Sequence, residues 1–409
     1  MTTVRSAMAV PLSEAQRLVQ RGIREVCEAF DDAYWRECDR EGRYPDEFVD
    51  TLAEEGWLGA LVPEEYGGPG LGTPEVVVMM EEIAASGGGF AGTQAIHGGI
   101  YNVPPLVNYA SEELKAELLP KLADGEVAVQ SLGLTEPNAG SDSTAMETTA
   151  RRSKDASGRP GNEYVVNGQK LWISRVDRTD YVVLMARTTP RDEVEKRTRG
   201  ISMFLVDVAD VREQGALETR RIPKTAADAV HSFELFFEDA RVPARNLVGE
   251  EGEGFYQLLD GLNEERLVIA AECIGLGEAA LEAGVAYAAE REVFDRPIGK
   301  NQAIQHPLAE AFAHLTAAKR VVHDAADRIH DVEREQAGVL ANTAKYLAAE
   351  AAFEAADAAV QTHGGFGVAR EYDVERYFRE ARLCRLVPIA QELALNYIGT
   401  TALDLPRSY

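Results

Sequence analysis

Glu265 is the residue of this sequence whose type and position most directly indicate chemistry. It lies in a run over 254–282 with helical spacing, and the apolar face of that run is formed by Leu258, Leu262 and Ile269. At about 100° per residue Glu265 falls within this face, whereas Glu264 points away from it. A carboxylate among apolar side chains is costly unless it is paired or needed. Two interpretations follow, a local ion pair with an arginine or a general base in an apolar pocket.

Two further stretches carry polar groups suited to a ring-shaped or phosphorylated ligand. Residues 134–142 read LTEPNAGSD, a turn in which the hydroxyls of Thr135 and Ser141 stand beside exposed backbone N–H groups. The alternative for this stretch is a plain loop. Trp172 and Ser174 follow in an expected strand, where the indole offers a flat apolar wall to a ligand or, alternatively, fills the core of a β-domain.

The spacing of the apolar residues changes twice along the chain, and it divides the elements that must position these residues into three groups. Residues 1–125 read as helices, 126–247 as short strands, and 248–409 as helices again. Short strands without helices between them favour an antiparallel barrel or sandwich over a parallel sheet. The fold class is therefore α+β and multidomain, with an N-terminal helical domain, a middle antiparallel β-domain and a C-terminal helical bundle. Helices of the bundle are predicted at about 252–290, 302–332, 337–363 and 374–400.

One stretch of the middle region predicts a tight hairpin. EYVVNGQKLWIS over 163–174 has two strand-like halves on either side of Asn167-Gly168. Asn-Gly between alternating apolar residues is the strongest short hairpin signal. We therefore expect two strands to meet there.

Composition limits the classes of function. The chain has 409 residues and a formal charge of −26, so nucleic acid and anionic membranes are excluded as expected partners. The four cysteines form no CxxC pair, and the seven histidines show no metal-ligand spacing, so reduced thiols and no metal are expected. No apolar run approaches the length of a membrane span, and a cytoplasmic protein is expected.

Several of these stretches together resemble motifs of the acyl-CoA dehydrogenase family. They are LTEPNAGSD, NGQKLWIS, FEDARVPARNLVGEEGEGF and REVFDRPIGKNQAIQ, and they follow one another at the separations typical of the family. The resemblance covers nearly the whole chain. It implies a helical domain, a β-domain and a four-helix bundle, non-covalent FAD, and a homotetramer built as a dimer of dimers.

The resemblance also implies roles for individual residues. Leu134 and Thr135 are expected at the flavin pyrimidine edge, and Ser141 near the FAD pyrophosphate or the CoA arm. Trp172 is expected to back the isoalloxazine, and Ser174 to hydrogen-bond near flavin N5.

A second group is expected to meet the FAD of a neighbouring subunit. Its members lie in REVFDRPIGKNQ and QTHGGFG, and they are Arg291, Phe294, Gln302, Gln361, Gly364 and Gly365. The alternative for Arg291 is a solvated cation at a helix end. His363, within the second motif, is expected to be structural.

The sequence departs from the commonest family pattern at its catalytic base. Many members carry that glutamate in a Tyr-Glu-Gly-Thr segment near the C-terminus, where this chain has VPIA over 387–390. A branch that includes isovaleryl-CoA and long-chain enzymes instead places it before an arginine on the first bundle helix, which here is Glu265 before Arg266. Helical phase selects the same residue independently. By the same matching, Asn263 and Arg266 are expected to contact the pantetheine or neighbouring substrate groups.

Two other departures are Ala390 and Glu392, where FAD-contacting Thr and Gln are usual, and Arg175 after WIS, where a small residue or Asn is usual. The first removes adenosine contacts that other members have. Arg175 is expected to change either the flavin edge or the access of a partner.

The expected reaction is FAD-dependent α,β-dehydrogenation of an acyl-CoA thioester to the trans-2-enoyl-CoA. Glu265 would remove the α-proton, the β-hydride would pass to flavin N5, and an electron-transferring flavoprotein would accept the electrons. Three alternatives remain open. They are a dehydrogenase of a carrier-protein-bound acyl group, a flavin monooxygenase or oxidase on the same fold, and a helical binding protein without catalysis.

Overall fold

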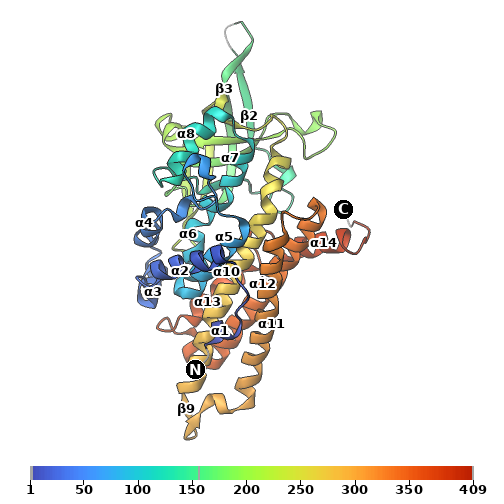
Figure 1. Ribbon diagram of the computed structural model, residues 1–409. Helices are drawn as coiled ribbons and strands as arrows, with labels where there is room; N and C mark the ends of the chain where they lie inside the picture. The colour runs from blue at the N-terminus through green and yellow to red at the C-terminus, as the bar shows by residue number, and fades with distance from the viewer. Residues whose placement is uncertain (1–2, 155–156, 408–409) are drawn as a thin grey trace.

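The chain folds into helices, then a sheet, then helices again, which confirms the predicted α+β architecture (Figure 1). A computed structural model describes residues 3–154 and 157–407. The N-terminal helices are α1 (Val4–Ala7), α2 (Glu14–Cys27), α3 (Asp32–Glu41), α4 (Asp46–Glu54), α5 (Thr73–Ile83), α6 (Gly89–Tyr101), α7 (Val103–Tyr109) and α8 (Glu112–Ala123).

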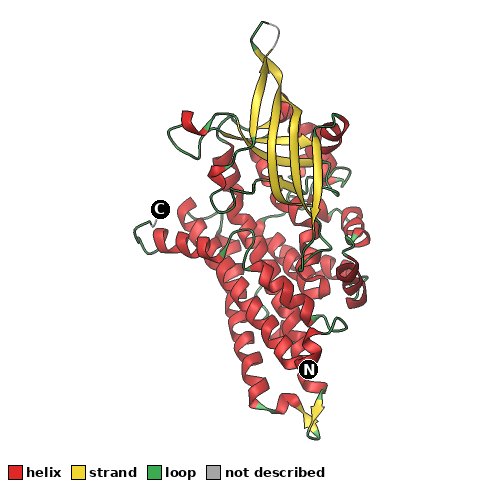
Figure 2. Cartoon of the chain, turned by 180° about the vertical axis from the view of Figure 1, so that it is seen from behind, coloured by secondary structure: helices red, strands yellow, loops and turns green. Residues whose placement is uncertain are grey.

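The middle region is built on one eight-stranded sheet in the order β6-β7-β3-β2-β4-β5-β8, with β1 beside β4 (Figure 2). The strands are β1 (Ser131–Gly133), β2 (Thr149–Lys154), β3 (Pro160–Ser174), β4 (Tyr181–Arg187), β5 (Ile201–Asp207), β6 (Leu217–Ile222), β7 (Ser232–Pro243) and β8 (Leu247–Val248), with the short helix α9 (Val208–Glu213) after β5. Most neighbours are antiparallel, as predicted, but β4 pairs in parallel with β1 and, at Thr149 and Arg187, with β2. β4 and β5 are apolar almost throughout because both of their faces are buried.

The hairpin predicted at Asn167-Gly168 is wrong, because β3 runs through both residues as one strand. Its register against β7 shifts between Val166 and Gly168, which marks a β-bulge. Gly168 has φ 149°, and a methyl group on it would lie 2.5 Å from Thr148 Oγ1. Asn167 Nδ2 donates to Asp239 on the neighbouring strand. The Asn-Gly pair therefore serves a bulge and a close backbone approach, and tertiary pairing overrides its turn preference.

The C-terminal region is a bundle around the long helix α10. Its helices are α10 (Gly254–Glu290), α11 (Gln302–Arg328), α12 (Arg334–His363), α13 (Val374–Cys384) and α14 (Gln391–Thr401), with the two-residue strands β9 (Glu292–Val293) and β10 (Arg296–Pro297) between α10 and α11. Alanines of α12 are buried against α10, which allows close approach of the two backbones. A methyl group on Gly277 would lie 3.2 Å from the Ala352 Cα. α10 also contacts α5 and α6, so it joins the two helical regions.

The single helix predicted over 374–400 is wrong, because the structure has two helices separated by residues 385–390. Pro388 has no N–H to continue a helix and restricts the residue before it. Lys345 of α12 holds the connection by donating to the Ile389 carbonyl and to Gln391 Oε1, both at 2.9 Å. This connection forms one wall of the cavity described below.

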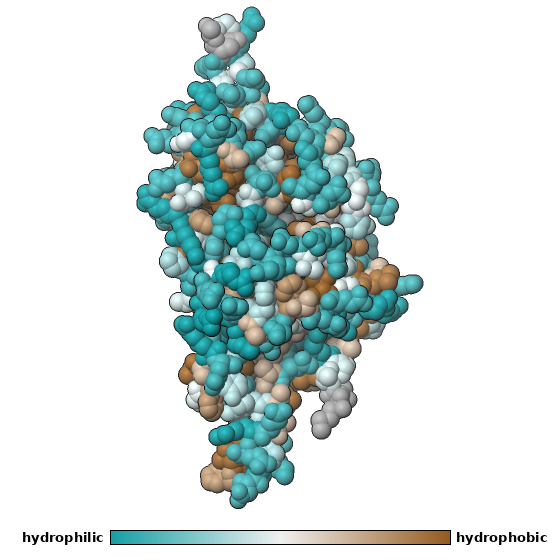
Figure 3. Space-filling model, turned by 90° about the vertical axis from the view of Figure 1, so that its left-hand side faces the viewer, coloured by the Kyte–Doolittle hydropathy of each residue, from teal (hydrophilic) through white to brown (hydrophobic). Residues whose placement is uncertain are grey.

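The outer surface is mainly hydrophilic on the face shown in Figure 3, in keeping with the large negative charge. Apolar atoms gather at the lower tip of that view, where the β9–β10 hairpin lies and where Phe294 is 92% exposed. None of the helices in residues 3–154 and 157–407 combines the length and apolar character that crossing a bilayer requires.

Ala352→Leu is expected to destabilise the protein. The residue is fully buried where α12 meets α10, and additional methylenes in a close-packed contact cost about 1–3 kcal/mol. Urea unfolding measures the change, with Ala317→Leu on the exposed face of α11 as the control. Equal unfolding midpoints for the two variants would contradict this account of the helix contact.

Candidate active site

A cavity of about 770 Å³ lies where α6, α10, the edge of the sheet and the connection before α14 meet. Its lining is mostly apolar, including Phe90, Leu259, Leu262, Ile269, Val387 and Pro388. Polar groups enter from separate elements: Gln94, His97 and Tyr101 from α6, Glu265 and Arg266 from α10, and Thr135, Ser141 and Ser174 from the middle region. An apolar cavity with a few convergent polar groups is the usual form of a ligand site.

Glu265 lies in this cavity and is 8% exposed. It is the one carboxylate among the described residues that line it. No arginine pairs with it in the described part of the chain; instead, His97 Nε2 lies 3.8 Å from its Oε1. The local arginine pair considered above is therefore not what the structure contains. The wall formed by residues 386–390 brings no acid into the cavity.

Asn263 and Arg266 lie beside each other on α10. Arg266 donates from Nη1 to Asn263 Oδ1 at 2.7 Å, and its Nε lies buried without a hydrogen-bond partner. Burial lowers the pKa of Arg266 from its usual value. Arg266 lines the cavity and Asn263 does not, so the structure brings only one of the two to the site directly.

A buried ion pair holds the turn that follows β1. Lys170 Nζ donates to the Leu134 carbonyl at 3.2 Å and to Glu136 Oε1 at 2.8 Å. Glu136 also accepts the backbone N–H groups of Glu147 and Thr148. Burial opposes the charge of Glu136, but the Lys170 ammonium and these N–H groups lower its pKa. The pair thereby presents Leu134 and the neighbouring hydroxyls to the cavity.

Trp172 stands on the cavity wall in an unusual backbone conformation. Its φ is 63° and its side chain is 53% exposed, while the register of β3 against β7 shifts between Lys170 and Ile173. A positive φ at a bulky residue is costly and is found mostly at functional sites. Ser174 Oγ, also in the cavity, lies 3.4 Å from Ser232 Oγ. An exposed indole, a hydroxyl and a polar turn fit a flat ring with one polar edge, as in a flavin.

Arg175 is structural in this arrangement. It is 2% exposed, and its guanidinium donates to the carbonyls of Gln130 and Gln94. It therefore joins the end of β3 to α6, and the unusual arginine after WIS fixes the distance between the two walls of the cavity.

The six residues predicted to meet FAD of a neighbouring subunit lie outside the cavity. All six are exposed at the far end of the bundle from Glu265, around the β9–β10 hairpin and the end of α12 (Figure 1). The Tyr287 ring stacks on His363 at 4.1 Å between centroids and holds these two segments at the same end. His363 Nδ1 lies 2.8 Å from the Ala359 carbonyl, which is a structural contact.

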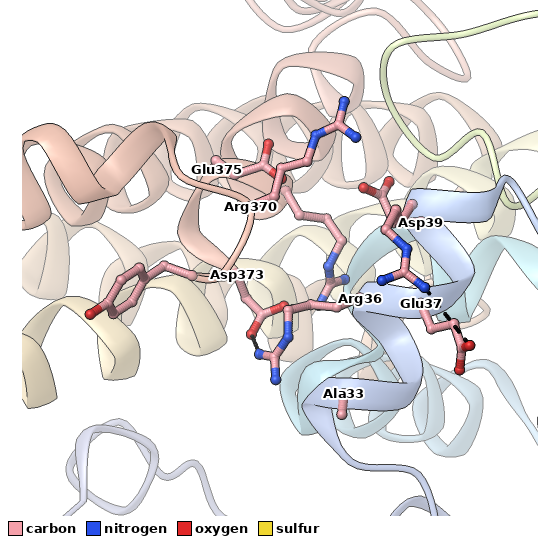
Figure 4. A pocket seen from close by; sticks show the side chains of 10 residues that line it. Ala33, Arg36, Glu37, Asp39, Arg370, Asp373 and Glu375 are labelled. Atoms are coloured by element: carbon pink, nitrogen blue, oxygen red, sulfur yellow. Dashed lines mark hydrogen bonds and ion pairs between the residues drawn. The ribbon is translucent and has the colours of Figure 1, made fainter.

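A second cleft, of about 360 Å³, lies between α3 and the start of α13 (Figure 4). Arg36 contacts Asp373 across it at 2.5 Å, and Asp39, which also lines it, contacts Arg379 of α13 at 2.7 Å. These pairs join the two helical regions, so we assign the cleft a structural role.

Sequence reasoning missed the polar residues of α6 and a second carboxylate of α10. Glu272 is fully buried, and His97 Nδ1 lies 2.6 Å from its Oε1. One signal was available, because Glu272 follows Glu265 by two helical turns and so shares its face. Nothing in the segment around His97 indicates that it faces them.

Comparison with known proteins identifies relatives over the whole chain. Three family models match: the acyl-CoA dehydrogenase N-terminal domain over residues 13–126, the middle domain over 131–240 and the C-terminal domain over 252–402. The chain is 34% identical over 400 residues to the acyl-CoA dehydrogenase FadE12 of Mycobacterium tuberculosis, covering 97% of this chain and 98% of that protein.

Two other relatives differ in organism and in the acyl group that their names give. Mitochondrial isovaleryl-CoA dehydrogenase of Pongo abelii is 32% identical over 393 residues, covering 95% of this chain and 88% of that protein. The structure of butyryl-CoA dehydrogenase from Megasphaera elsdenii superimposes with a TM-score of 0.87 at 28% identity, covering 97% of this chain and 100% of that one. Some further relatives are named reductases.

Lys170→Met is expected to destabilise the turn that carries Leu134. It leaves Glu136 buried without its cation, which costs about 3–5 kcal/mol, and it should lower the fraction of protein that retains flavin. Urea unfolding and flavin absorbance measure the two effects. Lys115→Met is the control, because its partner Glu112 is 82% exposed. Adding Glu136→Leu should recover much of the loss, and a double variant as unstable as Lys170→Met would argue against the ion pair as the cause.

Proposed function

This chain belongs to the acyl-CoA dehydrogenase family, and we propose that it oxidises an acyl-CoA thioester at Cα and Cβ with Glu265 as the base. The observation that carries the proposal is the position of Glu265: it is the one carboxylate among the described lining residues, in an apolar wall of the cavity. FAD is the cofactor of this family, and when bound it supplies the hydride acceptor for the reaction.

Glu265 would accept the proton from the thioester α-carbon. Leu262 and Ile269 lie on the same side of α10 and line the cavity with it, so water has little access to the carboxylate. A positioned base in such surroundings contributes about 10²–10⁴-fold to a proton transfer. The apolar lining from α6 and from residues 386–390 would receive the acyl chain.

Residues on the opposite wall would hold the cofactor and the CoA arm. Trp172 would back the flavin ring, while Leu134, Thr135 and Ser174 would meet its polar edge. Ser141, at the mouth of the polar turn, would contact the FAD pyrophosphate or the CoA arm. Arg266 and Asn263 would contact the pantetheine or neighbouring substrate groups; the buried, unpartnered Nε of Arg266 supports a further acceptor near it.

Assembly and electron transfer extend the proposal beyond one chain. The exposed group at the end of the bundle, which includes Arg291 and Phe294, would contact FAD held by another subunit, as in a homotetramer built as a dimer of dimers. An electron-transferring flavoprotein would accept the electrons. Some relatives are named reductases. By microscopic reversibility the same base would serve the reverse reaction, and the electron partner would set the physiological direction.

Glu265→Gln is expected to slow anaerobic flavin reduction about 10²–10⁴-fold while the protein keeps its FAD, because the amide cannot accept the proton. The substrate is whichever thioester bleaches the wild-type flavin fastest in a panel of straight, branched and aromatic acyl-CoAs. Glu264→Gln is the matched control, since that carboxylate faces His330 on another part of α10's surface.

A rate for Glu265→Gln within about tenfold of wild type would rule out the assignment of the base. Faster reduction by carrier-protein-bound thioesters than by CoA esters would instead identify a carrier-bound substrate.

A further inference from the structure

His97 lies between two carboxylates of α10. Its Nδ1 is 2.6 Å from Glu272 Oε1, and its Nε2 is 3.8 Å from Glu265 Oε1. His97 is 3% exposed and Glu272 is fully buried, so water does not screen these contacts. Gln94 Nε2 donates to the second oxygen of Glu272 at 2.9 Å and fixes that carboxylate in place. The three groups form a row that leads from the protein interior to the cavity.

The geometry restricts where protons lie in this row. The short Nδ1 contact requires one proton between His97 and Glu272. If Nε2 carried no proton, its lone pair would face the Glu265 carboxylate and repel it. A second proton therefore lies on Nε2 or on Glu265, and its position decides whether Glu265 can act as a base.

The surroundings favour the proton on the imidazole. Burial by itself opposes a charged histidine, but the carboxylates of Glu272 and Glu265 outweigh burial and raise the pKa of His97 above its usual value. The Tyr101 ring lies 4.7 Å from the imidazole, between centroids, and limits its rotation.

We propose that His97 is a positioning residue for Glu265: held by Glu272 as an imidazolium, it directs Nε2–H toward the Glu265 carboxylate and keeps that base ionised in the apolar cavity. The inference rests on the role of Glu265 proposed above. At 3.8 Å the attraction is that of an ion pair and not of a direct hydrogen bond. His97 itself transfers no proton to or from the substrate.

Of the other charged groups around the row, Arg266 also interacts with Glu265 through its charge, and all of them make their hydrogen bonds elsewhere. Arg175 donates to backbone carbonyls, Lys224 Nζ donates to the Val230 carbonyl at 2.6 Å, and Arg266 donates to Asn263. The thiol of Cys384, on α13 near Glu272, is buried, which raises its pKa and keeps it neutral. Among the described residues, Glu265 makes one ion pair, which is the contact with His97. Tyr101 of α6 also faces the row, close enough for both Glu265 and Glu272 to act on its hydroxyl.

The test is the pH dependence of flavin reduction in the holoenzyme carrying His97→Gln. The glutamine amide can still donate to Glu272 but carries no charge. The acid limb of the rate profile is expected to move to higher pH by at least about one unit, because Glu265 loses the cation that favours its ionised form. The rate on the alkaline plateau and the substrate KM should stay within about threefold of wild type.

His314→Gln is the matched control. Its imidazole makes the same 2.6 Å contact from Nδ1 to a carboxylate, that of Glu354, but on the exposed surface. Its profile should superimpose on that of the wild type. Glu272→Gln, which removes the carboxylate that holds Nδ1, should shift the acid limb in the same direction as His97→Gln and serves if His97→Gln does not fold.

A second measurement does not depend on activity. Nitrogen NMR of the holoenzyme labelled with ¹⁵N-histidine should contain, at neutral pH, an imidazolium signal that His97→Gln removes. Loss of a neutral-imidazole signal instead would overturn the proposal. So would an acid limb that stays in place or moves to lower pH, or a loss of rate that is equal at every pH. If Glu265→Gln is inactive while His97→Gln behaves as the control, this inference fails and the proposed function stands; an active Glu265→Gln removes both.

Discussion

Each buried carboxylate of α10 requires a partner from another element, and this requirement arranges the surrounding helices. Glu272 is held by His97 of α6, and Glu278, also fully buried, is held by Lys319 of α11 and Arg5 of α1. A buried carboxylate without its partner destabilises a protein by several kcal/mol, so these contacts select one packing of three helices about the fourth. The helix that carries the proposed base is thus held in place by two of its other carboxylates, which pair with residues of the surrounding helices.

The cavity depends on segments that are far apart in sequence and meet only in the folded chain. Arg175 ties the sheet to α6, Lys345 holds the connection before α14, and Lys170 supports the turn at Leu134. Each of these cations donates to a backbone carbonyl outside the regular helices and strands, at Gln130, Ile389 or Leu134, where no regular ladder satisfies it. The parts of the cavity wall that lie outside helices and strands are thus held by buried cations, of which Arg175 also lines the cavity.

Regular periodicity made much of this fold predictable from sequence. The phase of α10 alone indicated that Glu265 is buried, and the change of period separated helices from sheet. The failures came where tertiary contacts decide: Asn167-Gly168 forms a bulge because β7 pairs across it, and the helix predicted to 400 breaks at Pro388. His97 could not be predicted as a neighbour of Glu265, because helical phase describes one helix and not which face of α6 meets it.

The backbone conformation of Trp172 has an optical consequence. The chain has three tryptophans; Trp35 is 2% exposed, Trp57 is half-buried, and Trp172 turns its indole out onto the cavity wall. Trp172 is the most exposed of the three indoles, so its emission lies at the longest wavelength and responds to what covers the cavity wall. The intrinsic fluorescence of the protein therefore contains a built-in gauge of whether that wall faces solvent or is covered.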